Sequence, residues 1–168
     1  MKPLPRIVSV LSAALIIAAA IGFLDAAYLA AKYFTGGPIA CSVLDGCDTV
    51  TKSAYAVPAG IPVAVLGVMF YASVLVLALV FRERRSVTIA RLLAIAGAIG
   101  FLASVWLVSV QVFILDALCL YCILSAGSST AIFILGIAVW RLAVARANAS
   151  DAAGHDSTAG RLPAVGNK

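Results

Sequence analysis

Two pairs of cysteines are the residues of this sequence whose type and spacing point most directly to chemistry. Cys119 and Cys122 form a Cys-x-x-Cys motif in the stretch LDALCLYCILSAGSST, and Cys41 and Cys47 lie in IACSVLDGCDTV. The chain has four cysteines, so these two places hold all of them. Paired thiols can form structural disulfides, exchange electrons or bind a metal ion. The elements that carry the two pairs decide between these roles.

The composition is that of an integral membrane protein. Of the 168 residues, 64% are hydrophobic and only 11% are charged, and the mean hydropathy is +1.12. Soluble globular domains have far more charged residues than this. The net charge of +5 does not indicate a nucleic-acid partner, because the basic residues lie between the apolar runs. The expected surroundings are a lipid bilayer.

Four apolar runs are long enough to cross a bilayer, which takes about 20 residues of helix. They cover residues 7–33, 62–81, 88–115 and 117–140. We therefore predict an all-α integral membrane protein, a bundle of four transmembrane helices formed by residues 1–146, with an outer loop between the first two. Residues 147–168 are rich in Ala, Ser, Gly and Asp without an apolar period, which predicts a disordered cytoplasmic tail.

The distribution of Lys and Arg predicts the orientation. Ten of the twelve basic residues precede the first run, lie between the second and third, or follow the fourth, and only Lys32 and Lys52 fall on the other side. Cytoplasmic loops carry an excess of basic residues. Both termini are therefore expected in the cytoplasm and the long loop outside, as in a multi-pass protein of a bacterial inner membrane.

The first run has two further features. Its start resembles a secretory signal peptide, but the apolar stretch continues well beyond the usual length of such a peptide, so we expect it to be retained as a span. Asp25 lies inside this run and should face the bundle or the outer interface rather than lipid. A polar group satisfied by a neighbouring helix and a functional group are equally good interpretations of it.

This topology brings all four thiols to the oxidising side of the membrane, where disulfides form and persist. Cys119 and Cys122 are expected in the first turn of the fourth helix. Positions three apart lie on one helical face, and the N–H groups of the first turn stabilise a thiolate. Cys119, nearer the surface, is placed to exchange with the loop, and Cys122, one turn deeper, faces the region that a lipid-soluble electron acceptor can reach.

Two other interpretations of the cysteines stay open at this point. One is a pair of inert disulfides in a non-catalytic membrane scaffold. The other is a metal site of four thiolates, which the five residues between Cys41 and Cys47 and the lack of a nearby histidine do not favour. The single histidine, His155, lies in the predicted tail. We expect a thiol relay and no metal.

The motifs together resemble the vitamin K epoxide reductase family in its bacterial, disulfide-forming branch, in the form without a fused thioredoxin domain. The resemblance rests on Cys41-x5-Cys47, Ser53, the stretch GIPVAVLGVMFY at the start of the second span, and Cys119-x-x-Cys122 at the start of the last. These motifs occur in the family's order and cover roughly residues 7–140.

The resemblance implies a quinone-linked thiol–disulfide oxidoreductase. Cys41 then corresponds to the cysteine that exchanges with a thioredoxin-like partner, and Cys47 to the one that passes electrons to Cys119. Cys122 corresponds to the cysteine that reacts with the quinone, either ubiquinone or menaquinone. Ser53 matches a hydroxyl position near the redox centre, although an ordinary polar residue in a short interfacial helix would explain it as well.

Two positions depart from the animal members of the family. Those enzymes use an aromatic hydroxyl and an asparagine on the naphthoquinone head group, and Ala126 and Val63 occupy the matching positions here. The resemblance therefore implies plain quinone reduction rather than epoxide reduction. The small residues of 125–130, SAGSST, either leave room for a flat ring beside Ala126 or allow close helix packing.

We expect the protein partner to be a separate thioredoxin-fold oxidase outside the cytoplasm, because the chain carries no such domain after the last span. The main alternative with the same chemistry is a DsbB-type quinone reductase. That family places its Cys-x-x-Cys in the first outer loop and a widely spaced pair in the second, which is the reverse of the order in this chain.

Overall fold

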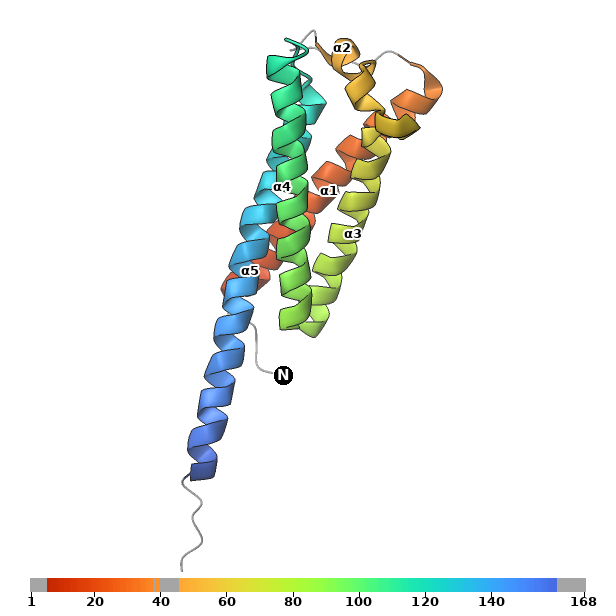
Figure 1. The fold of residues 1–168 in the computed structure, drawn as a ribbon. Coiled ribbons are helices and arrows are strands. Elements are labelled where there is room, and N and C mark those ends of the chain that lie inside the picture. Colours follow the sequence, from red (N-terminus) through yellow and green to blue (C-terminus); the bar gives the residue numbers. More distant parts are fainter. Residues whose placement is uncertain (1–5, 38, 40–45, 160–168) are drawn as a thin grey trace, which may run out of the picture.

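The computed structural model describes residues 6–37, 39 and 46–159 of the chain, and this part forms a bundle of long helices with a small helical cap at one end (Figure 1). The long helices are α1 (Arg6–Thr35), α3 (Val63–Arg84), α4 (Val87–Phe113) and α5 (Leu120–Ala159). The short ones are α2 (Cys47–Thr51) and the 3₁₀ helices η1 (Ala54–Ala56) and η2 (Pro58–Gly60). The described residues include no strand.

All four long helices are long and apolar enough to cross a membrane. Their candidate spans contain 30, 22, 27 and 31 residues, each above the length that a bilayer requires. The predicted all-α bundle with four membrane-spanning helices is therefore confirmed. The three short helices belong to the predicted loop between the first two spans.

A left-handed residue separates α3 from α4. Arg85 has φ 52° and ψ 33°, and its N–H donates to the carbonyl of Phe81 over 2.9 Å. This geometry ends α3 within the basic stretch RERR, and α4 begins directly after Ser86. A residue in the left-handed region is a common helix terminator, since it directs the chain away from the helix axis.

The link between α4 and α5 is longer than the sequence predicted. The expected spans 88–115 and 117–140 leave only Asp116 between them, whereas α4 ends at Phe113 and α5 begins at Leu120. The chain reverses at Asp116, which has φ 46°. The stretch VFILDALCL is apolar on both sides of this residue, so its composition does not mark where either helix stops.

Small residues let the helices approach closely, as they do in many membrane bundles. The helix α4 packs against α5, and α1 packs against both α3 and α5. A Cβ atom added at Gly97 of α4 would lie 2.8 Å from the Cα atom of Phe133 in α5. One added at Gly136 of α5 would lie 3.1 Å from the carbonyl oxygen of Leu93.

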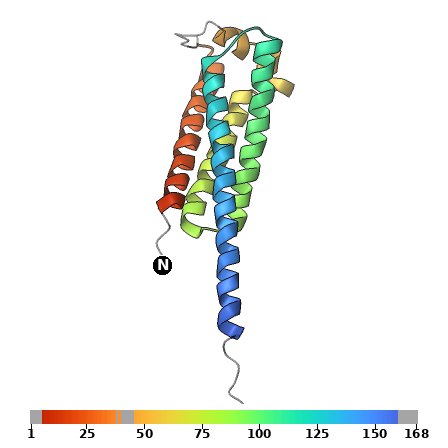
Figure 2. The same ribbon diagram turned by 90° about the vertical axis from the view of Figure 1, so that its left-hand side faces the viewer.

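The helix α5 extends well past the end of the bundle (Figures 1 and 2). It continues to Ala159, so it includes much of the segment 147–168 that the composition predicted to be a disordered tail. Alanine is the best helix former, and the alanines that follow Arg141 favour propagation of a helix that the bundle has already nucleated. Residues 160–168 lie outside the described part of the chain.

The helical cap lies at the end of the bundle where α4 connects to α5, and the α3–α4 turn lies at the opposite end (Figures 1 and 2). A second buried cluster joins the cap to this link, separate from the main core between the long helices. It is formed by Cys47, Val50 and Cys119. The fold thus brings the loop and the last helix together at the cysteines.

Candidate redox site

Cys47 and Cys119 lie in the same buried cluster although 72 positions separate their numbers in the sequence. Cys47 is the first residue of α2 and is 1% exposed, and Cys119 directly precedes α5 and is 0% exposed. Cys122, in the first turn of α5, packs against this cluster and is half-buried. The structure therefore brings together three of the four predicted redox cysteines. Cys41 lies outside the described residues.

A close backbone contact at Gly46 makes this approach possible. Gly46 precedes α2, and a Cβ atom at this position would lie 2.7 Å from the carbonyl oxygen of Leu118 and 2.8 Å from its nitrogen. No real Cβ atom fits at such distances from backbone atoms. The absence of a side chain at Gly46 therefore lets the residue before Cys47 pack on the residue before Cys119.

Gln111 holds the other side of the site and was not predicted from the sequence. Its side chain is 2% exposed, and its Oε1 atom accepts a hydrogen bond from the N–H of Cys119 over 3.0 Å. Its backbone carbonyl accepts a second one from the N–H of Ala117 over 3.1 Å. Gln111 thus fixes the link that leads to Cys119. One feature of the sequence could have identified it: Gln111 is an amide side chain inside an apolar run. Polar groups at membrane depth are costly unless they are hydrogen-bonded.

The structure holds both forms of cysteine at this site. Cys47 is in a disulfide, whereas Cys119 and Cys122 are free thiols. A disulfide and a pair of thiols are the two reactants that thiol–disulfide exchange requires.

The environment of Cys119 favours its thiolate. A hydrogen bond from the Cys122 side chain lowers the pKa of the Cys119 thiol to about 7, with further lowering by the N–H groups of Cys122 and Tyr121, while burial opposes the shift. These N–H groups belong to the first turn of α5, where helical donors have no intrahelical partner. A thiol with a pKa near neutral pH exchanges efficiently with disulfides.

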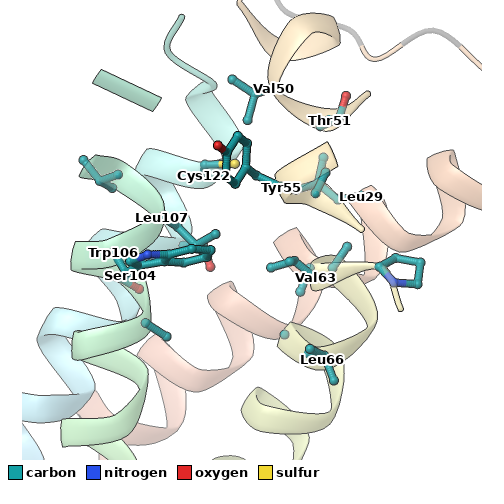
Figure 3. A pocket seen from close by; sticks show the side chains of 18 of the residues that line it. Leu29, Val50, Thr51, Tyr55, Val63, Leu66, Ser104, Trp106, Leu107 and Cys122 are labelled. Atoms are coloured by element: carbon teal, nitrogen blue, oxygen red, sulfur yellow. The ribbon is translucent and has the colours of Figure 1, made fainter. Parts of the chain in front are cut away.

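A cavity of about 430 Å³ adjoins Cys122 (Figure 3). Its lining comes from every long helix and from the cap, and most of it is apolar. In Figure 3, Cys122, Trp106 and Leu107 lie on one side of the cavity, and Val63 and Leu66 lie opposite them. The volume of this cavity, and its apolar lining with a few polar groups, are typical of a binding site for a small apolar molecule.

Three of the four residues expected at a quinone line this cavity, namely Cys122, Ser53 and Val63. The hydroxyl of Ser53 donates to the carbonyl of Val50 over 2.7 Å, which keeps this residue against α2. Ala126 is not among the lining residues, and its neighbours Ser125 and Ser129 are.

The small residues around Ala126 serve both of the purposes considered for them. Ser129 lines the cavity, and its hydroxyl also forms a hydrogen bond of 2.7 Å with that of Ser104 on α4. The same segment therefore provides room at the cavity wall and close contact between two helices.

Two polar side chains at the cavity come from α1 and α3. The hydroxyl of Tyr71 donates to the carbonyl of Ser125 over 2.8 Å, and its ring packs on Gly22, where a Cβ atom would collide with it. Asp25 is 7% exposed, and neither of its carboxylate oxygens has a hydrogen-bond partner in the described part of the chain. Both residues line the cavity that Cys122 adjoins.

Comparison with known proteins agrees with this geometry. A family model described as the vitamin K epoxide reductase family matches residues 13–137, well over half of the chain. The match includes all four cysteines, the helical cap and the cavity, and it ends before the extension of α5. No curated protein matches the chain significantly.

Proposed function

This chain belongs to the vitamin K epoxide reductase family, whose members are in general quinone-linked thiol–disulfide oxidoreductases of membranes, and we propose that it forms disulfides in a partner protein. In this proposal it is a single-domain member of the bacterial branch in the inner membrane. It oxidises a thioredoxin-fold protein outside the cytoplasm and passes the electrons to ubiquinone or menaquinone. The quinone is a substrate, consumed once in each turnover.

One observation carries the proposal: Cys47 and Cys119 share a buried cluster, and Cys122, one helical turn beyond Cys119, lines the apolar cavity. The Cys119–Cys122 pair therefore lies between the loop and the cavity. Electrons that enter at the loop reach the cavity through two thiol exchanges, with no large movement of the long helices required.

The proposed relay begins with a disulfide between Cys41 and Cys47. A thiolate of the partner attacks Cys41, and the resulting exchange oxidises the partner and reduces the loop pair. The Cys47 thiolate then attacks the sulfur of Cys119 in the oxidised helix pair, and Cys122 leaves as a thiolate that afterwards takes up a proton. When Cys41 attacks Cys47 in turn, the loop disulfide re-forms and the helix pair is a dithiol.

At the end of this sequence the helix pair is ready to give its electrons to the quinone. The quinone supplies the final step by accepting two electrons and two protons. The cavity beside Cys122 fits a quinone ring because it is mostly apolar, is large enough for a small molecule, and has a few polar side chains in its lining.

The proposed orientation places this site on the outer face of the membrane. In the sequence, ten of the twelve basic residues lie at or before the start of α1, around the turn between α3 and α4, or from Arg141 onward, and Arg82, Arg84 and Arg85 are at the turn itself. The positive-inside rule then puts that turn and both termini in the cytoplasm. The cysteines face the compartment where disulfides persist.

Thiol counting tests the proposal directly. The purified protein in lipid nanodiscs is reduced without oxygen, freed of reductant and mixed with a short-chain quinone, and its free thiols are counted. We expect all four thiols to disappear in the wild-type protein and quinol to form, because each dithiol can pass its electrons on. In the Cys122→Ser variant, quinol formation should stop. Wild-type thiols that persist after quinone addition would instead indicate a scaffold with structural disulfides.

A further inference from the structure

Asp25 is a buried acidic side chain that the proposed relay does not use. It lies in α1, in the part of that helix that crosses the membrane, and is 7% exposed. Both of its carboxylate oxygens are buried and lack a hydrogen-bond partner within residues 6–37, 39 and 46–159. Buried polar atoms are almost always paired in folded proteins, so an orphaned carboxyl group requires an explanation.

A purely structural role does not explain this carboxyl group. Tyr71 lines the same cavity, but its hydroxyl already donates to the carbonyl of Ser125 over 2.8 Å and also contacts the Ser125 hydroxyl at 2.9 Å. An unpaired acid inside a bundle costs several kcal/mol relative to an apolar residue of similar size. The geometry therefore leaves the hydrogen-bonding capacity of Asp25 for something that enters the cavity.

The position of Asp25 relates it to the redox cysteines. Asp25 and Cys122 line the same cavity from different helices. The carboxyl group is near enough to interact electrostatically with Tyr71 of α3, with Tyr121 and Cys122 of α5, and with Cys119 at the start of α5. None of these groups is a cation, so none of them can form a salt bridge with the carboxyl group. An acid that holds a proton beside a dithiol is suited to proton transfer.

We propose that Asp25 is the proton donor to a quinone oxygen in this cavity while the Cys119–Cys122 dithiol supplies the electrons. The inference rests on the proposed function, since it assumes that a quinone is the substrate. Conversion of a quinone to a quinol adds one proton to each of two oxygens. Those protons must reach a cavity whose wall is mostly apolar, and Asp25 is the one carboxyl group among the described residues that line it.

The atoms and electrons balance without another reactant. As the Cys119–Cys122 disulfide forms, two S–H bonds break, and the pair gives up two electrons and two protons. The quinone takes both electrons and both protons and leaves as the quinol. Asp25 gives its proton to one oxygen and takes one back from the thiols, so it is a neutral acid again at the end of each turnover.

The test separates the two halves of the reaction in the Asp25→Asn variant, which keeps the shape of the side chain but carries no acidic proton. Reduction of the helix pair through the loop, followed by thiol counting without quinone, should proceed as in the wild-type protein. Oxidation of the reduced protein by excess quinone in a single turnover should slow about 100-fold or more, the usual contribution of general acid catalysis. Asp116→Asn is the matched control, because Asp116 is exposed at the same end of the bundle and does not line the cavity.

A second measurement does not depend on turnover. Infrared difference spectra of the reduced protein, recorded with and without a bound redox-inactive quinone analogue, should contain a carboxylic acid C=O band that shifts on binding and is lost in Asp25→Asn. The Asp25→Glu variant keeps the acid and should retain the band and most of the oxidation rate. If Asp25→Asn does not fold, a change in the frequency of the band between the wild-type protein and Asp25→Glu assigns the band to this side chain instead.

The outcomes are distinguishable. If quinone oxidises neither the wild-type protein nor the variants, the proposed function fails and this inference fails with it. If quinone oxidises Asp25→Asn as fast as the wild-type protein, only the role of Asp25 is overturned. Loss of loop-to-helix transfer in Asp25→Asn, or a wild-type protein without the infrared band, would likewise overturn it and leave the relay in place.

Discussion

The side-chain oxygen of Gln111 accepts a hydrogen bond of 3.0 Å from the backbone N–H of Cys119, so a polar residue near the end of α4 holds the cysteine that precedes α5. Both groups are buried. At an exposed helix start, water would accept the hydrogen bond of this N–H group. Here the amide oxygen of Gln111 accepts it. It also fixes the backbone of the residue that packs with Cys47 in the buried cluster.

Replacement of Gln111 by Leu should reveal both effects. The variant leaves the N–H of Cys119 buried and unpaired, which should lower the free energy of unfolding by about 1–3 kcal/mol. Transfer of electrons from Cys47 to Cys119 should also slow, because the link is no longer held. Unfolding in a denaturing detergent measures the loss of stability, and the rate at which the helix pair is reduced measures the slower transfer. The Gln111→Glu variant keeps an acceptor oxygen and should lose less in both; equal losses in the two variants would contradict this role.

Gly46→Ala should separate the loop from the last helix. The added methyl group would meet backbone atoms of Leu118 at 2.7 and 2.8 Å, and backbone cannot rotate away as a side chain can. A shift of about 1 Å between reacting groups can cost roughly 100-fold in rate. Trapping of a Cys47–Cys119 disulfide in a Cys122→Ser background measures the approach. Gly127→Ala is the control, since nothing lies within 4 Å of a Cβ atom at that position; an equal yield of trapped disulfide in both would show that the contact is dispensable.

The reactivity of Cys119 should depend on pH through its neighbour. Its pKa is lowered to about 7, chiefly by the hydrogen bond from Cys122, so the thiolate predominates above that pH and the thiol below it. In the Cys122→Ala variant this donor is absent, so the pKa should rise and the pH of half-maximal alkylation should move upward. Cys122→Ser keeps a hydroxyl donor and should shift less. If the pH dependence of alkylation is unchanged in Cys122→Ala, the backbone N–H groups rather than Cys122 lower the pKa of the Cys119 thiol.

Labelling from the two sides of the membrane should establish the orientation. In a background without native cysteines, a reporter introduced as Lys52→Cys should react with a membrane-impermeant reagent added outside intact cells, and one introduced as Arg84→Cys should not. Lys52 is well suited because its side chain is 74% exposed, and its surface ion pair with Asp48 can be lost at little cost. The reverse labelling pattern would move every cysteine to the cytoplasmic face and remove the proposed route to an extracytoplasmic partner.

The sequence was sufficient for the features that depend on composition along one segment. The four spans follow from runs of apolar residues, and the turn after α3 follows from its basic stretch. The end of α4 and the start of α5 cannot be predicted in this way, because Phe113 to Leu120 is apolar throughout except at Asp116. The reversal of the chain at Asp116 depends on one backbone angle.

The features of the site that were missed depend on pairs of distant residues. Gln111 and Cys119 are neighbours only because the link between their helices folds back, and Gly46 matters only because Leu118 lies against it. Asp25 was recognised as unusual, but its position beside a cavity requires α1, α3 and α5 to be placed around it. Ala126 was expected at the cavity from the resemblance, and the helix instead turns Ser125 and Ser129 toward it.

The packing of the Tyr71 ring on Gly22 has a consequence for how this family of sequences can diverge. Any side chain at position 22 would occupy the volume of the ring, so mutation at one position is tolerated only with a matching change at the other. A lineage that gains even a methyl group at position 22 must move or replace the tyrosine ring, which disturbs the hydroxyl that is bonded to Ser125. The two positions should therefore covary, and the glycine–tyrosine pair should be inherited or lost as a unit.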